Sequence, residues 1–142
     1  MDNASVYTAA LMEHNVHPDY KYALEDATHV RHGINPSCGD DIMLSMRMED
    51  GTIDEIAFQG SGCAVSQASA DIMADLLTGQ TPERAVELAE LFLAMIRGEV
   101  EGEDALAPLG EAAQLQGISR MPARVKCAQL AWRTAMTMLA SE

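Results

Sequence analysis

Residues 42–59 read IMLSMRMEDGTIDEIAFQ, and this stretch decides the fold. Every second residue from position 42 to position 48 is apolar, which is the pattern of a β-strand with one buried face. Ile56 and Phe58 resume the alternation further on. Because the Asp50-Gly51 dipeptide between the two runs is typical of a two-residue turn, we predict an antiparallel hairpin over residues 42–59.

Two cysteine-containing turns flank this hairpin. The sequence NPSCGDD, residues 35–41, precedes its first strand, and GSGCA, residues 60–64, follows its second strand. The start of the first strand and the end of the second lie at the same end of an antiparallel hairpin, so Cys38 and Cys63 are expected to lie close together. Cys127 is the third cysteine of the chain, and we expect the fold to bring it to the same place.

Helical spacing of apolar residues follows the hairpin. It predicts a helix from Cys63 to a stop at Gly79 and a second helix that Thr81 caps, with a stop at Arg97. A last helix begins at Met121 and carries an apolar stripe spaced by three and four residues. Strands followed by helices predict an α+β fold.

Three other segments have weaker patterns. Ser5 is expected to cap a short amphipathic helix that ends before residue 15. Residues 20–32 fit either a short strand or a loop. Residues 98–117 are rich in glycine and acidic side chains, and we expect a solvated excursion there with at most a short helix over residues 109–115.

Composition limits the classes of function. The chain of 142 residues has a net charge of −13, which disfavours binding to nucleic acids and to anionic membrane surfaces. No run approaches the roughly 18 apolar residues of a membrane span, and the first residues do not resemble a signal peptide. We therefore expect one domain over residues 1–142 and a cytoplasmic location, where thiols more often bind metal or react than form disulfides.

The cysteines and one acidic residue form a candidate metal site. Cys38 and Asp40 are separated by Gly39, so both side chains can point the same way from a turn that favours glycine. With Cys63 and Cys127 they would supply three sulfurs and one oxygen, a set that suits tetrahedral zinc and also an iron-sulfur cluster. A helix start or a nearby cation, such as Arg124 or Lys126, would lower the pKa of a thiol at this site.

Simpler interpretations exist for each of these residues. A lone cysteine is as often a small buried apolar residue, and an aspartate beside a glycine is often only a turn residue. Four histidines are alternative ligands, although we expect most of them to be surface or cap residues: His14, His17, His29 and His32. The methionines, among them Met43, Met46 and Met48, are expected to fill the core.

Three motifs resemble those of a known family. The stretches NPSCGD (35–40), GSGCAVSQAS (60–69) and RVKCAQL (124–130) closely resemble the three cysteine motifs of the IscU/SufU family of iron-sulfur cluster assembly proteins, in particular of its SufU branch. The resemblance covers nearly the whole chain. It implies an α+β domain with a small antiparallel sheet of about three strands covered by several helices.

The SufU resemblance also implies a function. It implies a zinc-dependent sulfurtransferase that accepts persulfide sulfur from a pyridoxal-phosphate cysteine desulfurase, for use by downstream iron-sulfur assembly proteins. Zinc would bind to Cys38, Asp40, Cys63 and Cys127. Cys38 would leave the metal to take the sulfur, and Arg124 would stabilise the anionic sulfur.

Two alternatives to this function stay open. The first is a scaffold on which a [2Fe-2S] cluster is assembled and passed to apo-proteins, and the second is a purely structural zinc domain. Lys126 stands where scaffold members carry a histidine, and residues 98–117 resemble the extra segment of the SufU branch. Both features favour the sulfur acceptor over the scaffold.

Overall fold

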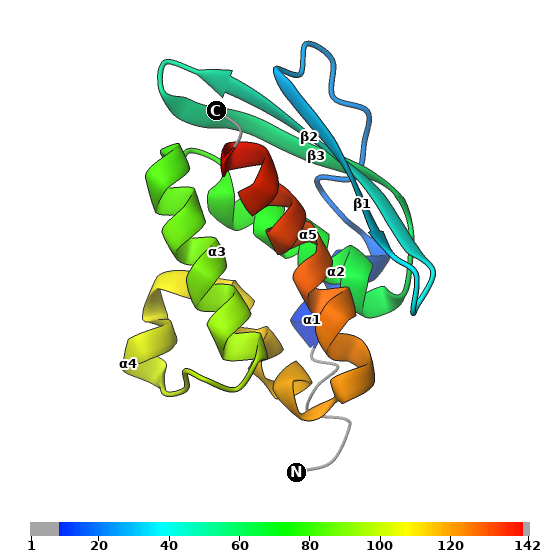
Figure 1. Ribbon diagram of the computed structural model, residues 1–142, viewed down its shortest axis with the longest axis vertical. Helices are drawn as coiled ribbons and strands as arrows, with labels where there is room; N and C mark the ends of the chain where they lie inside the picture. Colours follow the sequence, from blue (N-terminus) through cyan, green and yellow to red (C-terminus); the bar gives the residue numbers. More distant parts are fainter. Residues whose placement is uncertain (1–8, 141–142) are drawn as a thin grey trace.

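The computed structural model describes residues 9–140, which form a three-stranded antiparallel sheet with its helices packed beside it (Figure 1). The strands are β1 (His29–Asn35), β2 (Asp40–Glu49) and β3 (Thr52–Ser61), in the order β1-β2-β3. The helices are α1 (Ala9–Val16), α2 (Ala64–Leu77), α3 (Pro82–Ile96), α4 (Glu103–Leu106), the 3₁₀ segment η2 (Ala107–Arg120) and α5 (Pro122–Ala140). The predicted α+β fold class with a small antiparallel sheet is confirmed.

The hairpin forms as predicted. Strands β2 and β3 pair around the Asp50-Gly51 turn, with Glu49 opposite Thr52 and a register shift between Arg47 and Met48. One face of the hairpin is buried against the helices, through Ile42, Leu44, Met46, Ile53, Ile56 and Phe58. Met43 lies on the other face and is 39% exposed, so the expectation that it fills the core is wrong.

The three predicted long helices are confirmed, and they pack on one another through aromatic and small side chains. The Thr81 hydroxyl accepts a hydrogen bond from Arg84 N at the start of α3, as expected of an N-cap. The rings of Phe92 in α3 and Trp132 in α5 stack with centroids 3.9 Å apart. Trp132 Nε1 also donates a hydrogen bond to Ser69 Oγ in α2, at 2.9 Å. These contacts fix α2, α3 and α5 as one layer.

The first and last helices of the described residues are α1 and α5. The predicted cap residue Ser5 lies outside the described residues, which include α1 from Ala9 onward. At the other end, α5 is the longest helix described. Within residues 9–140, no helix combines the length and the apolar character needed to cross a membrane.

Part of residues 20–32, predicted as either a strand or a loop, forms strand β1. It pairs antiparallel with β2 from His29, opposite Met46, to Asn35, opposite Asp40. Because β1 is an edge strand with only Gly33 and Asn35 buried, its sequence lacks the apolar alternation of a half-buried strand. The pairing brings Asn35 beside Asp40, at the end of the sheet where the cysteine turns lie.

The expectation of a solvated excursion over residues 98–117 holds for residues 98–105, where all but the half-buried Val100 are exposed, and is wrong from Leu106 onward. Four apolar side chains of η2 are buried in the core, and they are spaced by three residues: Leu109, Ala112, Leu115 and Ile118. The backbone of η2 is not helical at Gly110, and beyond this break the spacing of three matches the three residues per turn of a 3₁₀ helix and does not produce the 3.6-residue period of an α-helix. The segment therefore covers α3 as part of the folded body.

Leu115→Ala tests this placement of η2. Removing a buried leucine side chain is expected to lower the free energy of unfolding by about 2–5 kcal/mol. Gln116→Ala, at the neighbouring exposed position, should change it by about 0.5 kcal/mol or less. Urea denaturation of both variants measures the difference, and equal small effects would mean that the segment lies free in solvent.

Candidate metal centre

Three segments far apart in sequence meet at one end of the sheet. Cys38 and Asp40 lie at the turn between β1 and β2, which contains Gly39 at φ 71°, and Cys127 lies in the second turn of α5. The ligand atoms of Cys38, Asp40 and Cys127 all lie within 4.8 Å of one another, and the two Sγ atoms are 3.0 Å apart. All three cysteines of the chain are free thiols. The expected convergence of Cys38 and Cys127 on Asp40 is present.

Asp40 is the fixed point of this group. Its side chain is fully buried, and its Oδ1 accepts hydrogen bonds from Cys63 N at 3.0 Å and Ser66 Oγ at 3.1 Å. Asn35 Nδ2 donates to its Oδ2 at 3.1 Å. Burial alone would raise the pKa of Asp40, but hydrogen bonds from Cys63 N, the Cys127 thiol and these two side chains outweigh it and hold the pKa below its usual value. Asp40 is therefore held as a carboxylate in one orientation.

Cys63 lies beside this group, at the start of α2. Its Sγ accepts a hydrogen bond from Ser66 N at 3.5 Å, so Cys63 acts as the N-cap of this helix. It lies outside the set of three residues within 4.8 Å, but its thiol interacts with that of Cys127. The backbone N–H of Cys63 also binds Asp40. Both Cys63 and Ser66 thus connect the start of α2 to the centre.

Cys127 is the buried member of the group. Burial raises the pKa of its thiol far above the usual range, and the neighbouring Cys38, Asp40 and Cys63 raise it further. The expectation that a helix start and nearby cations lower the thiol pKa is therefore wrong for Cys127. The physical reason is that desolvation and three groups that can carry negative charge outweigh the cations.

A divalent cation reverses this electrostatic situation, because it favours every deprotonated ligand around it. The donor set of thiols and a carboxylate is one that zinc prefers, and tetrahedral coordination places such ligand atoms about 3.3–3.8 Å apart. The separations among Cys38, Asp40 and Cys127 are of that order. By this test the residues present fit a metal ion.

Arg124 lies where the sequence analysis expected a cation. Its Nη1 is 3.8 Å from the Sγ of Cys38, which is half-buried and so remains partly accessible to solvent. Lys126 does not face the thiol. Its side chain is exposed and lines a groove beside the centre. One cation therefore faces the accessible thiol, and the other faces solvent next to it.

Sequence reasoning gave no role to three residues that build the centre. Asn35 and Ser66 both donate hydrogen bonds to Asp40, and Asn35 Nδ2 also lies 3.7 Å from Cys127 Sγ. At Gly62, a Cβ atom would lie only 2.6 Å from Asp40 Oδ1 and 2.3 Å from Ser66 Oγ. The one signal for Ser66 is its place three residues after Cys63, the position that an N-cap residue binds.

The histidines serve other contacts. His14 lies between two carboxylates, with Nδ1 2.5 Å from Asp71 Oδ2 and Nε2 2.5 Å from Glu111 Oε1. Burial lowers the pKa of His14, but these two partners together raise it above its usual value. His32 pairs with Asp41 on the exposed face of the sheet. Among residues 9–140, no histidine belongs to the group formed by Cys38, Asp40 and Cys127.

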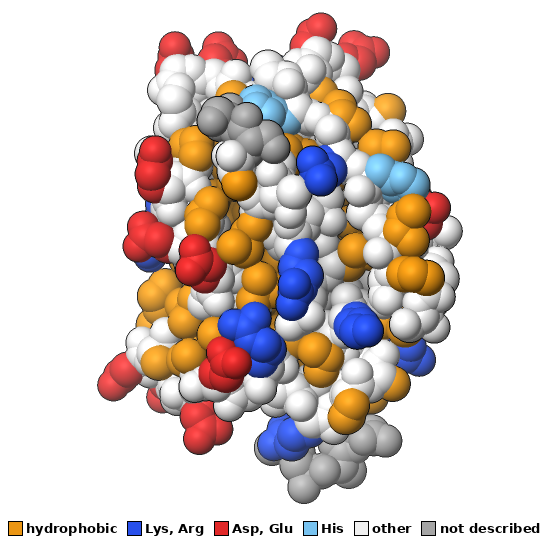
Figure 2. All heavy atoms as spheres, in the orientation of Figure 1, with side chains coloured by type: hydrophobic (Ala, Val, Ile, Leu, Met, Phe, Trp, Pro, Cys, Tyr) orange, Lys and Arg blue, Asp and Glu red, His pale blue; other side chains and the backbone are white. Residues whose placement is uncertain are grey.

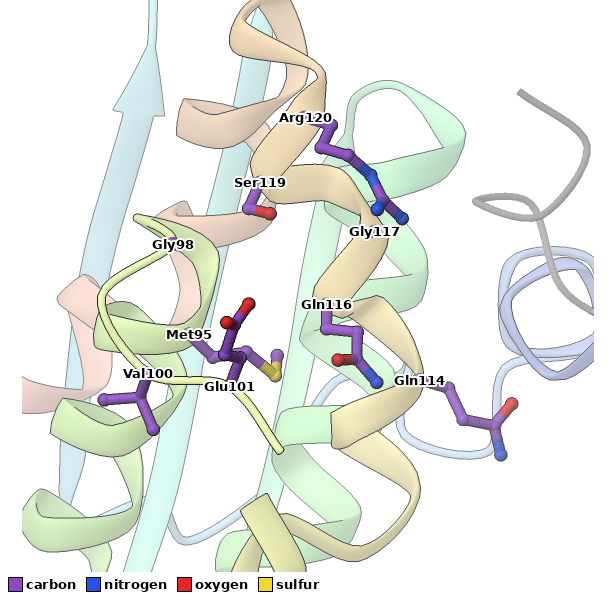
Figure 3. Close-up of a pocket in the computed structure, with 9 residues that line it drawn as sticks. All are labelled: Met95, Gly98, Val100, Glu101, Gln114, Gln116, Gly117, Ser119 and Arg120. Carbon is purple, nitrogen blue, oxygen red and sulfur yellow. The ribbon is translucent and has the colours of Figure 1, made fainter. Parts of the chain in front are cut away.

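A separate hollow of about 400 Å³ lies between the end of α3 and η2 (Figure 3). Met95, Glu101 and Gln116 point into the space between the two elements, whereas Gln114 and Arg120 point away from it. None of the residues that line it is a cysteine or a histidine. This hollow is thus not part of the metal centre.

The fold and the centre define a class of protein: a small α+β domain with a metal-binding group of thiols and a buried carboxylate. The model of the NifU-like N-terminal domain family matches residues 6–128. The chain belongs to this family, and the resemblance to IscU/SufU proteins is confirmed.

Individual relatives cover most of the chain. The chain is 36% identical to the zinc-dependent sulfurtransferase SufU of Bacillus subtilis, over 97% of this chain and 92% of the relative. It is 37% identical to the iron-sulfur cluster assembly scaffold protein IscU of Streptococcus pyogenes, over 89% of this chain and 78% of the relative. The crystal structure of FiSufU from Fervidobacterium islandicum superposes with a TM-score of 0.87 at 30% identity, covering 97% of this chain and 99% of that one.

Gly62→Ala tests the support of Asp40. The added methyl group must displace Asp40 or Ser66, so we expect metal affinity to fall by about 10-fold or more, as it does when an outer partner of a metal ligand is lost. Competition with a chromogenic chelator, with Zn²⁺ as the probe ion, measures the affinity. Ser61→Ala, at the exposed neighbour, is the control and should bind like the parent protein. Equal affinity in both variants would contradict this role of Gly62.

Proposed function

We propose that the chain is a zinc-dependent sulfur acceptor, which takes persulfide sulfur from a pyridoxal-phosphate cysteine desulfurase for iron-sulfur cluster assembly. Zinc would be held by Cys38, Asp40, Cys63 and Cys127. The relative of 36% identity that is named a zinc-dependent sulfurtransferase supports this function. Bound zinc would keep these thiols deprotonated near neutral pH.

The observation that carries the proposal is the environment of Cys38. Cys127 is buried beneath the surface, whereas Cys38 is half-buried at a turn and has Arg124 Nη1 3.8 Å from its sulfur. A positive group at this distance would stabilise the negative charge of a persulfide formed on Cys38. Cys63 is also half-buried, but its sulfur caps α2, so Cys38 is the partly exposed thiol with a cation beside it.

The transfer needs no added oxidant. The Cys38 thiolate attacks the outer sulfur of the donor persulfide, R–S–SH, and a new sulfur–sulfur bond forms on Cys38. The donor sulfur–sulfur bond breaks, and the donor leaves as the thiolate R–S⁻. The transferred sulfur keeps its proton or loses it to solvent, and Arg124 stabilises the resulting negative charge.

A scaffold for a [2Fe-2S] cluster is the second candidate. It is supported by relatives named iron-sulfur cluster assembly scaffold proteins, at similar identity. The exposed side chain of Lys126, at the position next to Cys127, adds no ligand to the centre. Incubation with iron and sulfide without oxygen separates the two candidates, because a scaffold turns brown and its visible absorption survives desalting.

Cys38→Ala tests the proposed acceptor. Without this thiol the chain should accept no sulfur and should lose its acceleration of desulfurase turnover, measured as sulfur released from cysteine. Arg124→Gln should slow the transfer by about 10-fold or more, because the charge beside the sulfur is lost. Gln116→Ala, at an exposed position away from the centre, is the control and should retain full acceleration. A Cys38→Ala protein that accelerates the desulfurase as well as the parent would contradict the proposal.

A further inference from the structure

A groove of about 440 Å³ lies beside the metal centre, between the end of β1 and the outer side of α5. We call it the β1/α5 groove. It is lined by Ile34, Asn35, Lys126, Gln129, Leu130 and Arg133, together with the turn at residues 36–37. Asn35, Gln129 and Leu130 are buried and form its floor, whereas Ile34 is 55% exposed and Lys126 and Arg133 are exposed at its rim.

The groove lies in the cationic part of an otherwise acidic chain. Residues 27–39 and 112–141 contain five of the nine Lys and Arg residues of the chain and none of its 22 Asp and Glu residues. Figure 2 shows the result, with Lys and Arg side chains gathered over and around α5 and most acidic side chains at the edges of this face. In a chain of net charge −13, the cations on this face can attract a negatively charged partner.

The cations at the rim are not neutralised within the described structure. Arg47, Arg84 and Arg97 pair with carboxylates elsewhere on the molecule. Lys126 and Arg133 form no salt bridge with any residue of 9–140, and Arg133 donates only to the amide oxygen of Gln129, at 3.3 Å. Their charges are thus available to a partner.

The floor of the groove leads to the metal centre. Asn35 lines the groove and also donates hydrogen bonds to Asp40 and Cys127. Ser37 and Lys126 are the immediate neighbours of Cys38 and Cys127 in the chain. A segment bound in the groove therefore rests against residues that contact or adjoin three of the four expected ligands.

We infer that the β1/α5 groove binds an acidic segment of the sulfur donor, with its carboxylates at Lys126 and Arg133 and an apolar side chain on Ile34 and Leu130. This inference rests on the proposed function, which supplies the donor as the partner. The contact positions the donor beside Cys38. Because attraction between rim charges acts mainly on the rate of encounter and is screened by salt, binding through the groove weakens as ionic strength rises.

The experiment measures binding of the full chain, labelled at its N-terminal amine, to the cysteine desulfurase of the same organism by fluorescence anisotropy at 50 and 300 mM NaCl. We expect Lys126→Glu/Arg133→Glu to raise the Kd by about 10-fold or more at low salt, and the effect to shrink at high salt. Arg133→Glu alone, six residues from the expected metal ligand Cys127, should raise the Kd by a smaller factor. The zinc content and thermal midpoint of each variant check that the centre and the fold are retained.

The matched control is Lys21→Glu/Arg84→Glu, which makes the same change in net charge away from the groove. Its Kd should stay within about threefold of the parent. If both double variants weaken binding equally, the effect is general repulsion and the inference is overturned. Unchanged binding by Lys126→Glu/Arg133→Glu also overturns it.

A second readout separates this inference from the proposed function. Mass spectrometry after incubation with glutathione persulfide measures whether Cys38 takes up one sulfur atom without a protein donor. We expect Lys126→Glu/Arg133→Glu to accept sulfur from glutathione persulfide like the parent, while losing acceptance from the desulfurase. If the parent accepts no sulfur from either donor yet binds the desulfurase through the groove, the proposed function fails and the inference stands.

Discussion

The buried carboxylate of Asp40 is the interaction on which the structure of the centre depends. A buried charge is costly unless it is hydrogen-bonded, and Asp40 receives hydrogen bonds from Cys63 N, Ser66 Oγ and Asn35 Nδ2. These donors come from β1 and from the start of α2, while Cys127 packs against the same group from α5. One side chain therefore fixes how the sheet and two helices meet.

The sequence predicts this architecture where its patterns are strong and local. The hairpin with the Asp50-Gly51 turn and the helices α2, α3 and α5 follow from period-2 and helical spacing, and hairpin geometry alone brings Cys38 and Cys63 to one end. Of segment η2 only a short helix over residues 109–115 was predicted, because its buried residues recur every three positions, a period that belongs to a 3₁₀ helix. The metal-binding group was predicted because cysteines are few and chemically distinctive. The hydrogen-bond donors around Asp40 are common residue types, so the sequence did not point to them.

Other features of the centre depend on contacts between elements that are far apart in the sequence, and no local sequence pattern predicts these contacts. Asn35 and Gly62 acquire their roles only when β1 and the start of α2 approach Asp40. The raised pKa of Cys127 likewise arises from burial and from neighbours remote in the sequence. The centre and the groove share Asn35, so the proposed recognition of a donor and the proposed chemistry at Cys38 would take place side by side on a single surface. Residues 112–141, which include α5, contain no acidic residue, and Arg124 and Lys126 lie beside the centre.

The central claim is that three sulfurs and the Asp40 oxygen bind a single divalent ion. X-ray absorption at the zinc K edge, on the protein loaded with one equivalent of zinc, tests it most directly. The account predicts a shell of three sulfur ligands at about 2.3 Å and one oxygen ligand at about 2.0–2.2 Å. A shell with fewer than three sulfurs, or with a histidine nitrogen in place of the oxygen, would contradict it.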